Sequence, residues 1–287
     1  MLGKLFAHEW KDTWKLMTVL NGTVLVLSVL GVIFAATGNL VDVIKRDSIS
    51  SVWVFLMYMS FFMVYVLGIL ALSIGTTLYF YIRFYRNMYT DQGYLMHTLP
   101  VNEHELILSK ALVAFIWKII GAVVTAMGIG AIIAAFVSTT GDFINEILPY
   151  AHEIFGEYIE EVYDGNAGLF ALYLAAMLIT GIGSVIYSIF MGYMAISLGQ
   201  QVKKNKVLAS VGIFFGVNIV VSMITNMINQ FVMLFVVKLN DGEAFRQGRF
   251  GAASIGTSLL MGIIIWLLAG VFYVVSHRIM KDRLNLE

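Results

Sequence analysis

The sequence contains no cysteine and only two prolines, and 13% of its residues are charged. The absence of cysteine excludes disulfide bonds and thiol chemistry. The formal net charge is zero, so the chain lacks the basic excess of a nucleic-acid-binding protein, and no nucleic-acid partner is expected. What is present is a chain of 287 residues that is 60% hydrophobic, more apolar than a soluble domain of this length. The composition is that of a membrane protein.

Six apolar stretches reach the length of roughly 20 helical residues that crosses a hydrocarbon core about 30 Å thick. Their approximate bounds are 16–37, 52–82, 107–138, 167–199, 207–237 and 252–276. The sequence therefore predicts an all-α polytopic membrane protein with six transmembrane helices, forming a single transmembrane domain over residues 1–287. The first apolar run is too long for the core of a signal peptide, so we expect it to be retained.

Lysine and arginine are divided unevenly between the connections. If the N-terminus is inside, the outer connections hold only Lys45, Arg46, Lys238, Arg246 and Arg249. The inner segments hold the larger set: Lys4, Lys11, Lys15, Arg83, Arg86, Lys110, Lys203, Lys204, Lys206, Arg278, Lys281 and Arg283. Because cytoplasmic segments carry an excess of these residues, both the N- and C-termini are predicted to be cytoplasmic.

Residues 2–17, before the first crossing, have an amphipathic helical pattern. One stripe holds Leu2, Phe6, Trp10, Trp14 and Met17, and the other holds Lys4, His8, Lys11 and Lys15. Tryptophan favours the headgroup layer and lysine an anionic inner leaflet. The pattern predicts an interfacial helix that binds membrane lipids, and a partner-binding role for it stays open.

The connection at residues 139–166 carries seven acidic residues and no lysine or arginine: Asp142, Glu146, Glu153, Glu157, Glu160, Glu161 and Asp164. Apolar residues recur there at helical spacing and are interrupted at Pro149, which predicts two short helices in an extracytoplasmic acidic loop. The loop is either a solvated acidic surface or a vestibule that favours cationic cargo.

Polar residues line one face of the fifth crossing: Asn218, Ser222, Thr225, Asn226 and Asn229. Such a face either bonds to neighbouring helices or lines a translocation path or subunit seam. In the third crossing, Lys118 is close enough to Lys110 to reach the inner interface with its side chain. Small residues on the fourth crossing, namely Gly181, Ser184, Ser188 and Gly192, predict close helix packing or a dimer seam.

The sequence lacks the catalytic motifs of ATPases and of zinc hydrolases. No glycine-rich loop followed by Lys and Ser or Thr is present, so we expect no ATPase site of its own. Three His-Glu dipeptides lack the second histidine that a zinc hydrolase needs. The chain is therefore predicted to be a non-enzyme without a cofactor or metal.

The stretch "FYRNMYTDQGYLMHTLPVNEHELILSK", residues 84–110, is the longest soluble-looking run among the inner segments. Helix is expected to continue from Phe84 to Gln92 until Gly93 interrupts it. Leu99-Pro100 predicts an extended turn, and Asn102 with Glu105 can form a capping box for the next helix.

With these features the sequence resembles the permease subunits of ABC-2 type ATP-binding cassette transporters, which are bacterial exporters. The residues that carry the resemblance are "YTDQGYLMHTLPVNEHELILSK": an acidic residue, a glycine, a Leu-Pro turn and a basic residue entering the next crossing. The amphipathic start and the six crossings extend it over essentially the whole chain. Asp91 stands where many relatives have glutamate, and the large outer insert follows the third crossing, so a peptide exporter fits better than a polysaccharide exporter.

The resemblance implies a cytoplasmic coupling loop, residues 83–106, that docks on an ATPase subunit binding ATP and Mg. The docking residues would be Phe84, Tyr85, Met88, Tyr89, Asp91, Gln92 and Gly93. It further implies paired ATPases, a second permease subunit, a multi-pass location in the bacterial cytoplasmic membrane, and export of peptides, lipids or hydrophobic compounds. The alternatives are a secondary transporter or channel, for which only Lys118 offers a charge within the membrane, and a non-transporting scaffold or sensor.

Overall fold

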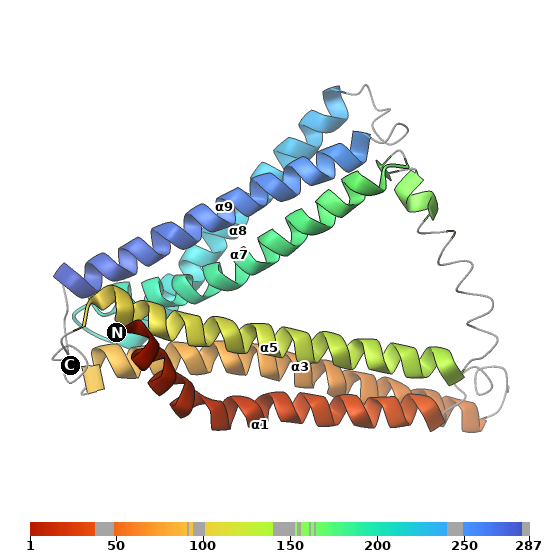
Figure 1. The fold of residues 1–287 in the computed structure, drawn as a ribbon, viewed down its shortest axis with the longest axis horizontal. Helices are drawn as coiled ribbons and strands as arrows, with labels where there is room; N and C mark the ends of the chain where they lie inside the picture. The colour runs from red at the N-terminus through yellow and green to blue at the C-terminus, as the bar shows by residue number, and fades with distance from the viewer. Residues whose placement is uncertain are drawn as a thin grey trace. The chain divides into compact units, whose positions relative to one another are not determined.

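The computed structural model describes residues 1–37, 49–90, 92–93, 101–139, 153, 156–160, 162–163, 165–239 and 249–282. Most of these residues belong to six long helices: α1 (Leu2–Thr37), α3 (Ile49–Tyr89), α5 (Glu103–Thr139), α7 (Ala167–Gly199), α8 (Lys206–Leu239) and α9 (Arg249–Asp282) (Figure 1). Each helix contains a segment that is long and apolar enough to cross a membrane. The all-α fold with six candidate membrane-spanning helices is confirmed.

All of these helices except α7 are longer than the predicted crossings. The six helices range from 33 residues in α7 to 41 in α3, which corresponds to about 50 to 60 Å of helix. This exceeds a hydrocarbon core of about 30 Å, so the helices tilt or extend beyond it. α1 continues without a break from the residues predicted to lie in the interface, and it bends in its first part (Figure 1).

Large apolar side chains cover the outward faces of the helices. Val19, Met63, Leu178, Leu208 and Ile263 are each more than 60% exposed. A soluble protein would bury such side chains, whereas lipid tails solvate them. Inside a helix, each backbone N–H group has its acceptor in the same segment, so these helices can lie in lipid without unpaired amides.

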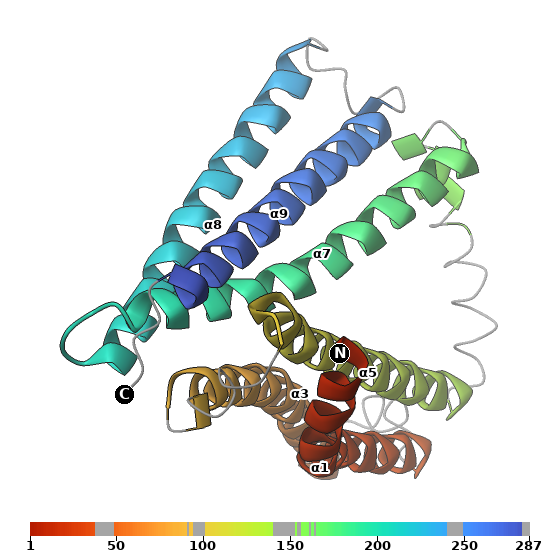
Figure 2. The same ribbon diagram turned by 60° about the vertical axis from the view of Figure 1, so that its left-hand side comes forward.

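The chain divides into two compact units, and the division falls within α3 and α5. The first, the α1 unit, consists of Gly3–Phe80 and Leu112–Ala151. In it α1 and α5 run in the same direction, with α3 antiparallel to both (Figures 1 and 2). The three helices approach closely at Gly128, where an added Cβ atom would lie 2.2 Å from Ser28 Oγ. Ser28 Oγ in turn lies 3.1 Å from the hydroxyl oxygen of Tyr65, so this buried polar pair is satisfied.

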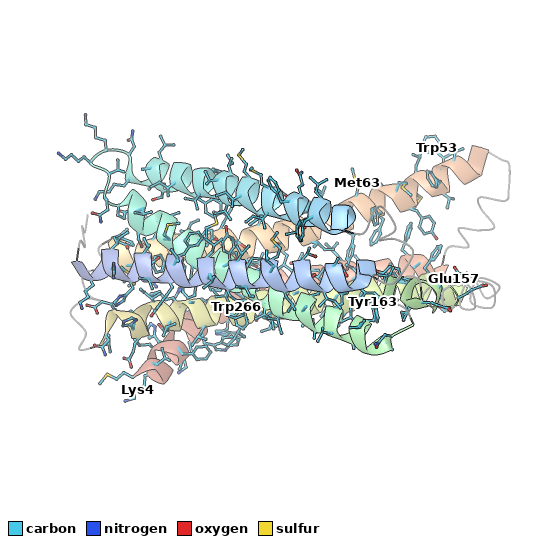
Figure 3. All side chains as sticks on the ribbon, turned by 90° about the horizontal axis from the view of Figure 1, so that it is seen from above. Lys4, Trp53, Met63, Glu157, Tyr163 and Trp266 are labelled. Carbon is cyan, nitrogen blue, oxygen red and sulfur yellow. The ribbon has the colours of Figure 1, made fainter. Side chains whose placement is uncertain are left out.

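The second unit, the α7 unit, consists of Met1–Leu2, Tyr81–Ala111 and His152–Glu287. α9 packs along α7, and α8 runs antiparallel to both (Figure 2). Trp266 of α9 donates from its indole Nε1 to the carbonyl oxygen of Ile179, 3.3 Å away (Figure 3). Gly183 makes room for this ring, because a Cβ atom there would lie 2.7 Å from Nε1. Met191, Met194 and Phe272 form the buried core nearby.

The segment before α7 is helical over residues 156–160. Tyr163 (labelled in Figure 3) is fully buried. Its ring lies against Gly251 at the start of α9. Three acidic side chains of this segment are exposed: Glu153, Glu157 and Glu160. The remaining acidic residues (Asp142, Glu146, Glu161 and Asp164) and Pro149 lie outside the described residues. The predicted second short helix and the vestibule stay predictions.

Candidate functional site

The segment of residues 84–93 begins as the last turns of α3, which ends at Tyr89. The hydroxyl of Thr90 donates to the Arg86 carbonyl oxygen at 2.7 Å, and the amide of Gly93 donates to the Thr90 carbonyl oxygen at 2.6 Å. A Cβ atom on Gly93 would lie only 2.6 Å from the Met88 carbonyl oxygen, so the turn requires glycine. Helix therefore continues past the crossing as predicted; α3 ends at Tyr89, and Gln92 and Gly93 are again helical. Asp91 lies outside the described residues.

Aromatic side chains fix this end of α3 on α7. The ring of Phe84 is stacked on that of Tyr193, with centroids 3.8 Å apart and planes 7° apart. The Tyr89 hydroxyl donates to Ser197 Oγ at 2.7 Å, and Ser197 Oγ donates to the Tyr193 carbonyl oxygen at 2.8 Å. Because Tyr193 and Ser197 are four residues apart, they present one face of α7 to the segment.

Tyr81 extends the same contact by two helical turns. Its hydroxyl donates to the carbonyl oxygen of Ser188, and its ring lies directly over Gly192. An added Cβ atom at Gly192 would be 2.1 Å from the ring. Gly192, one of the four small residues predicted to permit close packing on the fourth crossing, thus serves that purpose. Gly181, by contrast, has no heavy atom within 4 Å of where its Cβ would be.

These contacts bury part of the predicted docking surface. Phe84, Met88 and Tyr89 are at most 1% exposed, and Gly93 is buried as well. Their side chains cannot contact a second protein in this conformation, because α7 covers the apolar rings. Tyr85 is half-buried, and Gln92 is exposed. Arg86, which the sequence reasoning did not include, is exposed beside them.

The connection to α5 ends in a cluster that the sequence reasoning missed. The Asn102 carbonyl oxygen accepts from the amide of Glu105 at 2.9 Å, and α5 begins at Glu103. The Glu105 carboxylate lies 3.3 Å from the amine of Met1, instead of closing the predicted capping box. One residue earlier, the His104 ring stacks on His277 of α9 at 3.7 Å. Leu99 and Pro100 lie outside the described residues.

The polar face of α8 points away from the other helices of the α7 unit. Asn218, Ser222, Asn226 and Asn229 are exposed, and Thr225 is half-buried. The two hydroxyls donate to carbonyl oxygens of α8 itself: Ser222 to Ile219 at 3.0 Å and Thr225 to Val221 at 2.9 Å. The three asparagine side chains form no hydrogen bond to another described residue. No helix of the described chain therefore supplies the partners that these amides need in lipid.

The described residues offer no group of three or more His, Cys, Asp or Glu side chains that could hold a metal ion. Comparisons with protein-family models, with curated proteins and with solved structures give no match to the chain. Two features of the described chain are candidates for a functional role: the helix end at residues 84–93 and the polar face of α8.

Proposed function

We propose that this chain is the permease subunit of an ABC-2 type transporter, an exporter of peptides, lipids or hydrophobic compounds. A separate ATPase subunit, which binds ATP and Mg, supplies the energy. The observation that carries the proposal is the construction of the 84–93 segment. It is a helix end fixed rigidly to α7, and Arg86 and Gln92 remain exposed on it. A segment that transmits force needs both a firm attachment and an accessible surface.

The distribution of lysine and arginine supports a cytoplasmic location for the 84–93 segment. Lys203 and Lys204, in the turn between α7 and α8, are exposed, as are Arg278 and Lys281 at the end of α9. The segment that precedes the opposite end of α7 carries exposed Glu157 and Glu160. By the positive-inside rule the first set faces the cytoplasm of a bacterial cell, where ATP is available. The N- and C-termini lie on that side.

The start of α1 is proposed to lie along the inner membrane surface. Lys4, Lys11 and Lys15 are exposed, and Lys4 points away from the helices (Figure 3). Trp14 is 47% exposed, although its ring is large and apolar. Lysines that reach anionic headgroups and a tryptophan in the interface are the pattern of an interfacial helix.

In the proposed mechanism, ATP-driven association of two ATPases moves two docked permeases. Movement of the 84–93 segment passes to α7 through the contacts of Tyr81, Phe84 and Tyr89, because stacked rings and hydrogen bonds leave little freedom between the two helices. The polar face of α8 lines the path or the seam with the second permease. Its asparagines are the exposed hydrogen-bonding groups that a polar cargo or a second subunit can use.

The test is ATP hydrolysis by the complex purified through this chain from its native membranes. The wild-type preparation should hydrolyse ATP, although the chain has no P-loop. Replacing Arg86 and Gln92 together by alanine should lower the ATPase activity recovered per mole of chain at least tenfold. The matched control, Glu157→Ala, should leave it unchanged. Wild-type preparations without ATPase activity, or cargo movement driven by an ion gradient in ATP-free vesicles, would contradict the proposal.

A further inference from the structure

Asn21 of α1 carries a polar atom that has no partner within the described chain. Its side chain is 7% exposed, and its Nδ2 donates to the Met17 carbonyl oxygen at 2.8 Å. Its Oδ1 is buried and accepts no hydrogen bond from any described residue. Asn21 lies in a segment apolar enough to cross a membrane. An unpaired amide oxygen is especially unfavourable there, because lipid offers no donor.

Gly121 of α5 has no side chain that could fill the region beside this oxygen. A Cβ atom built on Gly121 of α5 would lie 3.5 Å from Asn21 Oδ1 and 3.8 Å from Leu72 Cδ2 of α3, both ordinary van der Waals separations. Oδ1 thus faces a methyl-sized space where three helices of the α1 unit converge. Two turns further along α5 the helices are closed, because a Cβ atom on Gly128 would overlap Ser28 Oγ.

A buried donor without a partner lies one turn from that space. Trp117 precedes Gly121 by four residues, so the two share a face of α5. Its side chain is 6% exposed and stacks on Trp10 at 4.8 Å. The indole Nε1 donates to no described residue. An unpaired acceptor on α1 and an unpaired donor on α5 therefore both lie where these two helices meet.

We infer that the α1 unit binds water at this position, which we call the Asn21 site. A water molecule donates to Asn21 Oδ1 and, directly or through a second water, accepts from Trp117 Nε1. A water that makes two or more hydrogen bonds is the usual solution for buried polar atoms. A hydrocarbon group would leave both atoms unpaired. The site goes beyond the proposed transport function and holds whether or not an ATPase binds the chain.

The satisfied pair of Ser28 and Tyr65 limits the hydrated region. Their 3.1 Å contact fills the helix interface at the level of Gly128. Water at the Asn21 site is therefore confined to the part of the α1 unit nearer to the start of α1.

The site can be tested by water-edited solid-state NMR on the chain in lipid bilayers, with 15N in the tryptophan indoles. Single Trp→Phe variants assign the five signals. The Trp117 indole should receive magnetisation from water although its side chain is buried. Trp266 is the matched control, because its Nε1 already donates to the Ile179 carbonyl oxygen. Absence of transfer at Trp117, or transfer of equal strength at Trp266, overturns the inference.

Gly121→Ala gives a second, independent readout. If the space holds water, the added methyl group displaces it, so the Trp117 water signal is lost and the Tm falls. If the space is dry, alanine fills it and strengthens the helix, so the Tm rises. Asn21→Leu should likewise reduce the Trp117 water signal. A raised Tm for Gly121→Ala, or an unchanged water signal in both variants, contradicts the site.

Discussion

The hydroxyl of Tyr89 donates to Ser197 Oγ over 2.7 Å and joins the end of α3 to α7. Both side chains are buried, so this hydrogen bond is shielded from water. It makes the 84–93 segment part of the α7 unit. Movement of the segment and movement of α7 are therefore coupled, and the strength of the coupling can be measured.

A double-mutant cycle tests the Tyr89 and Ser197 contact. Tyr89→Phe removes one hydroxyl and should lower the free energy of unfolding by about 1 kcal/mol, the net value of a typical intramolecular hydrogen bond. Ser197→Ala should cost a similar amount. The double variant should be less destabilised than the sum of the two, because both remove one bond. Denaturant unfolding in detergent micelles measures the three values, and strict additivity would show that the two hydroxyls do not interact.

Gly192→Ala is predicted to disturb the contact of Tyr81 with α7. The new methyl group would overlap the Tyr81 ring, which must move and give up its hydrogen bond to the Ser188 carbonyl oxygen. A loss of about 1 to 3 kcal/mol is expected from such overpacking. Gly181→Ala on the same helix is the control, and it should be neutral or stabilising because its Cβ meets nothing. Equal effects of the two variants on the Tm would refute the close approach at Gly192.

In the α1 unit, Gly128 and Gly130 allow the same comparison between a closely packed glycine and an open one. Gly128→Ala places a methyl group on Ser28 Oγ and near the Tyr65 hydroxyl, so it should be destabilising by about 1 to 3 kcal/mol. Gly130→Ala meets no neighbouring atom and should not be destabilising. Thermal unfolding of both variants checks the packing of α1, α3 and α5. A Gly128→Ala protein as stable as Gly130→Ala would mean that these helices are further apart.

The absence of cysteine makes the orientation directly measurable. A single cysteine at Lys203 should react with a membrane-impermeant maleimide only after the cytoplasmic side is opened. A cysteine at Glu157 should react in intact cells. Both side chains are exposed, so accessibility within the chain does not limit either reaction. The reversed labelling pattern would place the 84–93 segment outside, where no ATPase could reach it.

Asn226→Leu is predicted to impair function without lowering stability. The Asn226 amide forms no hydrogen bond to a described residue. Its removal should therefore change the free energy of unfolding of the isolated chain by no more than about 0.5 kcal/mol. Cargo export or the association of two permeases should fall, because the proposed path or seam loses a hydrogen-bonding group. A large loss of stability would instead indicate that the α8 face packs inside the chain.

The six helices were predictable because hydrophobic length alone defines a membrane crossing. The predicted crossing at 167–199 coincides with α7, and the other helices extend beyond their predicted bounds. The extensions contain residues such as Arg86 and Glu103, whose charge lowers hydrophobicity without opposing helix formation. Hydropathy locates the part of a helix that fits in lipid, and it does not locate where the helix ends.

The partners of individual side chains were less predictable. The resemblance implied that Phe84, Met88 and Tyr89 belong to a docking surface, whereas these three side chains are buried, and Phe84 and Tyr89 contact α7. Aromatic rings that bind a partner protein and rings that pack internally have the same sequence pattern. Ser188 and Gly192 on the fourth crossing gave a signal for close packing, but nothing in the sequence paired them with Tyr81. Contacts of this kind, between residues far apart in the sequence, can be identified only from the structure.

Site-specific photo-crosslinking from position 92 tests the central claim most directly. Gln92 is exposed at the end of the 84–93 segment, so a photoreactive amino acid there should contact whatever docks on it. In native membranes we predict an adduct with a protein that also labels with a photoreactive ATP analogue, and no such adduct from position 157. If position 92 forms no adduct with an ATP-binding protein, or forms the same adducts as position 157, the segment does not dock an ATPase and the proposed function is wrong.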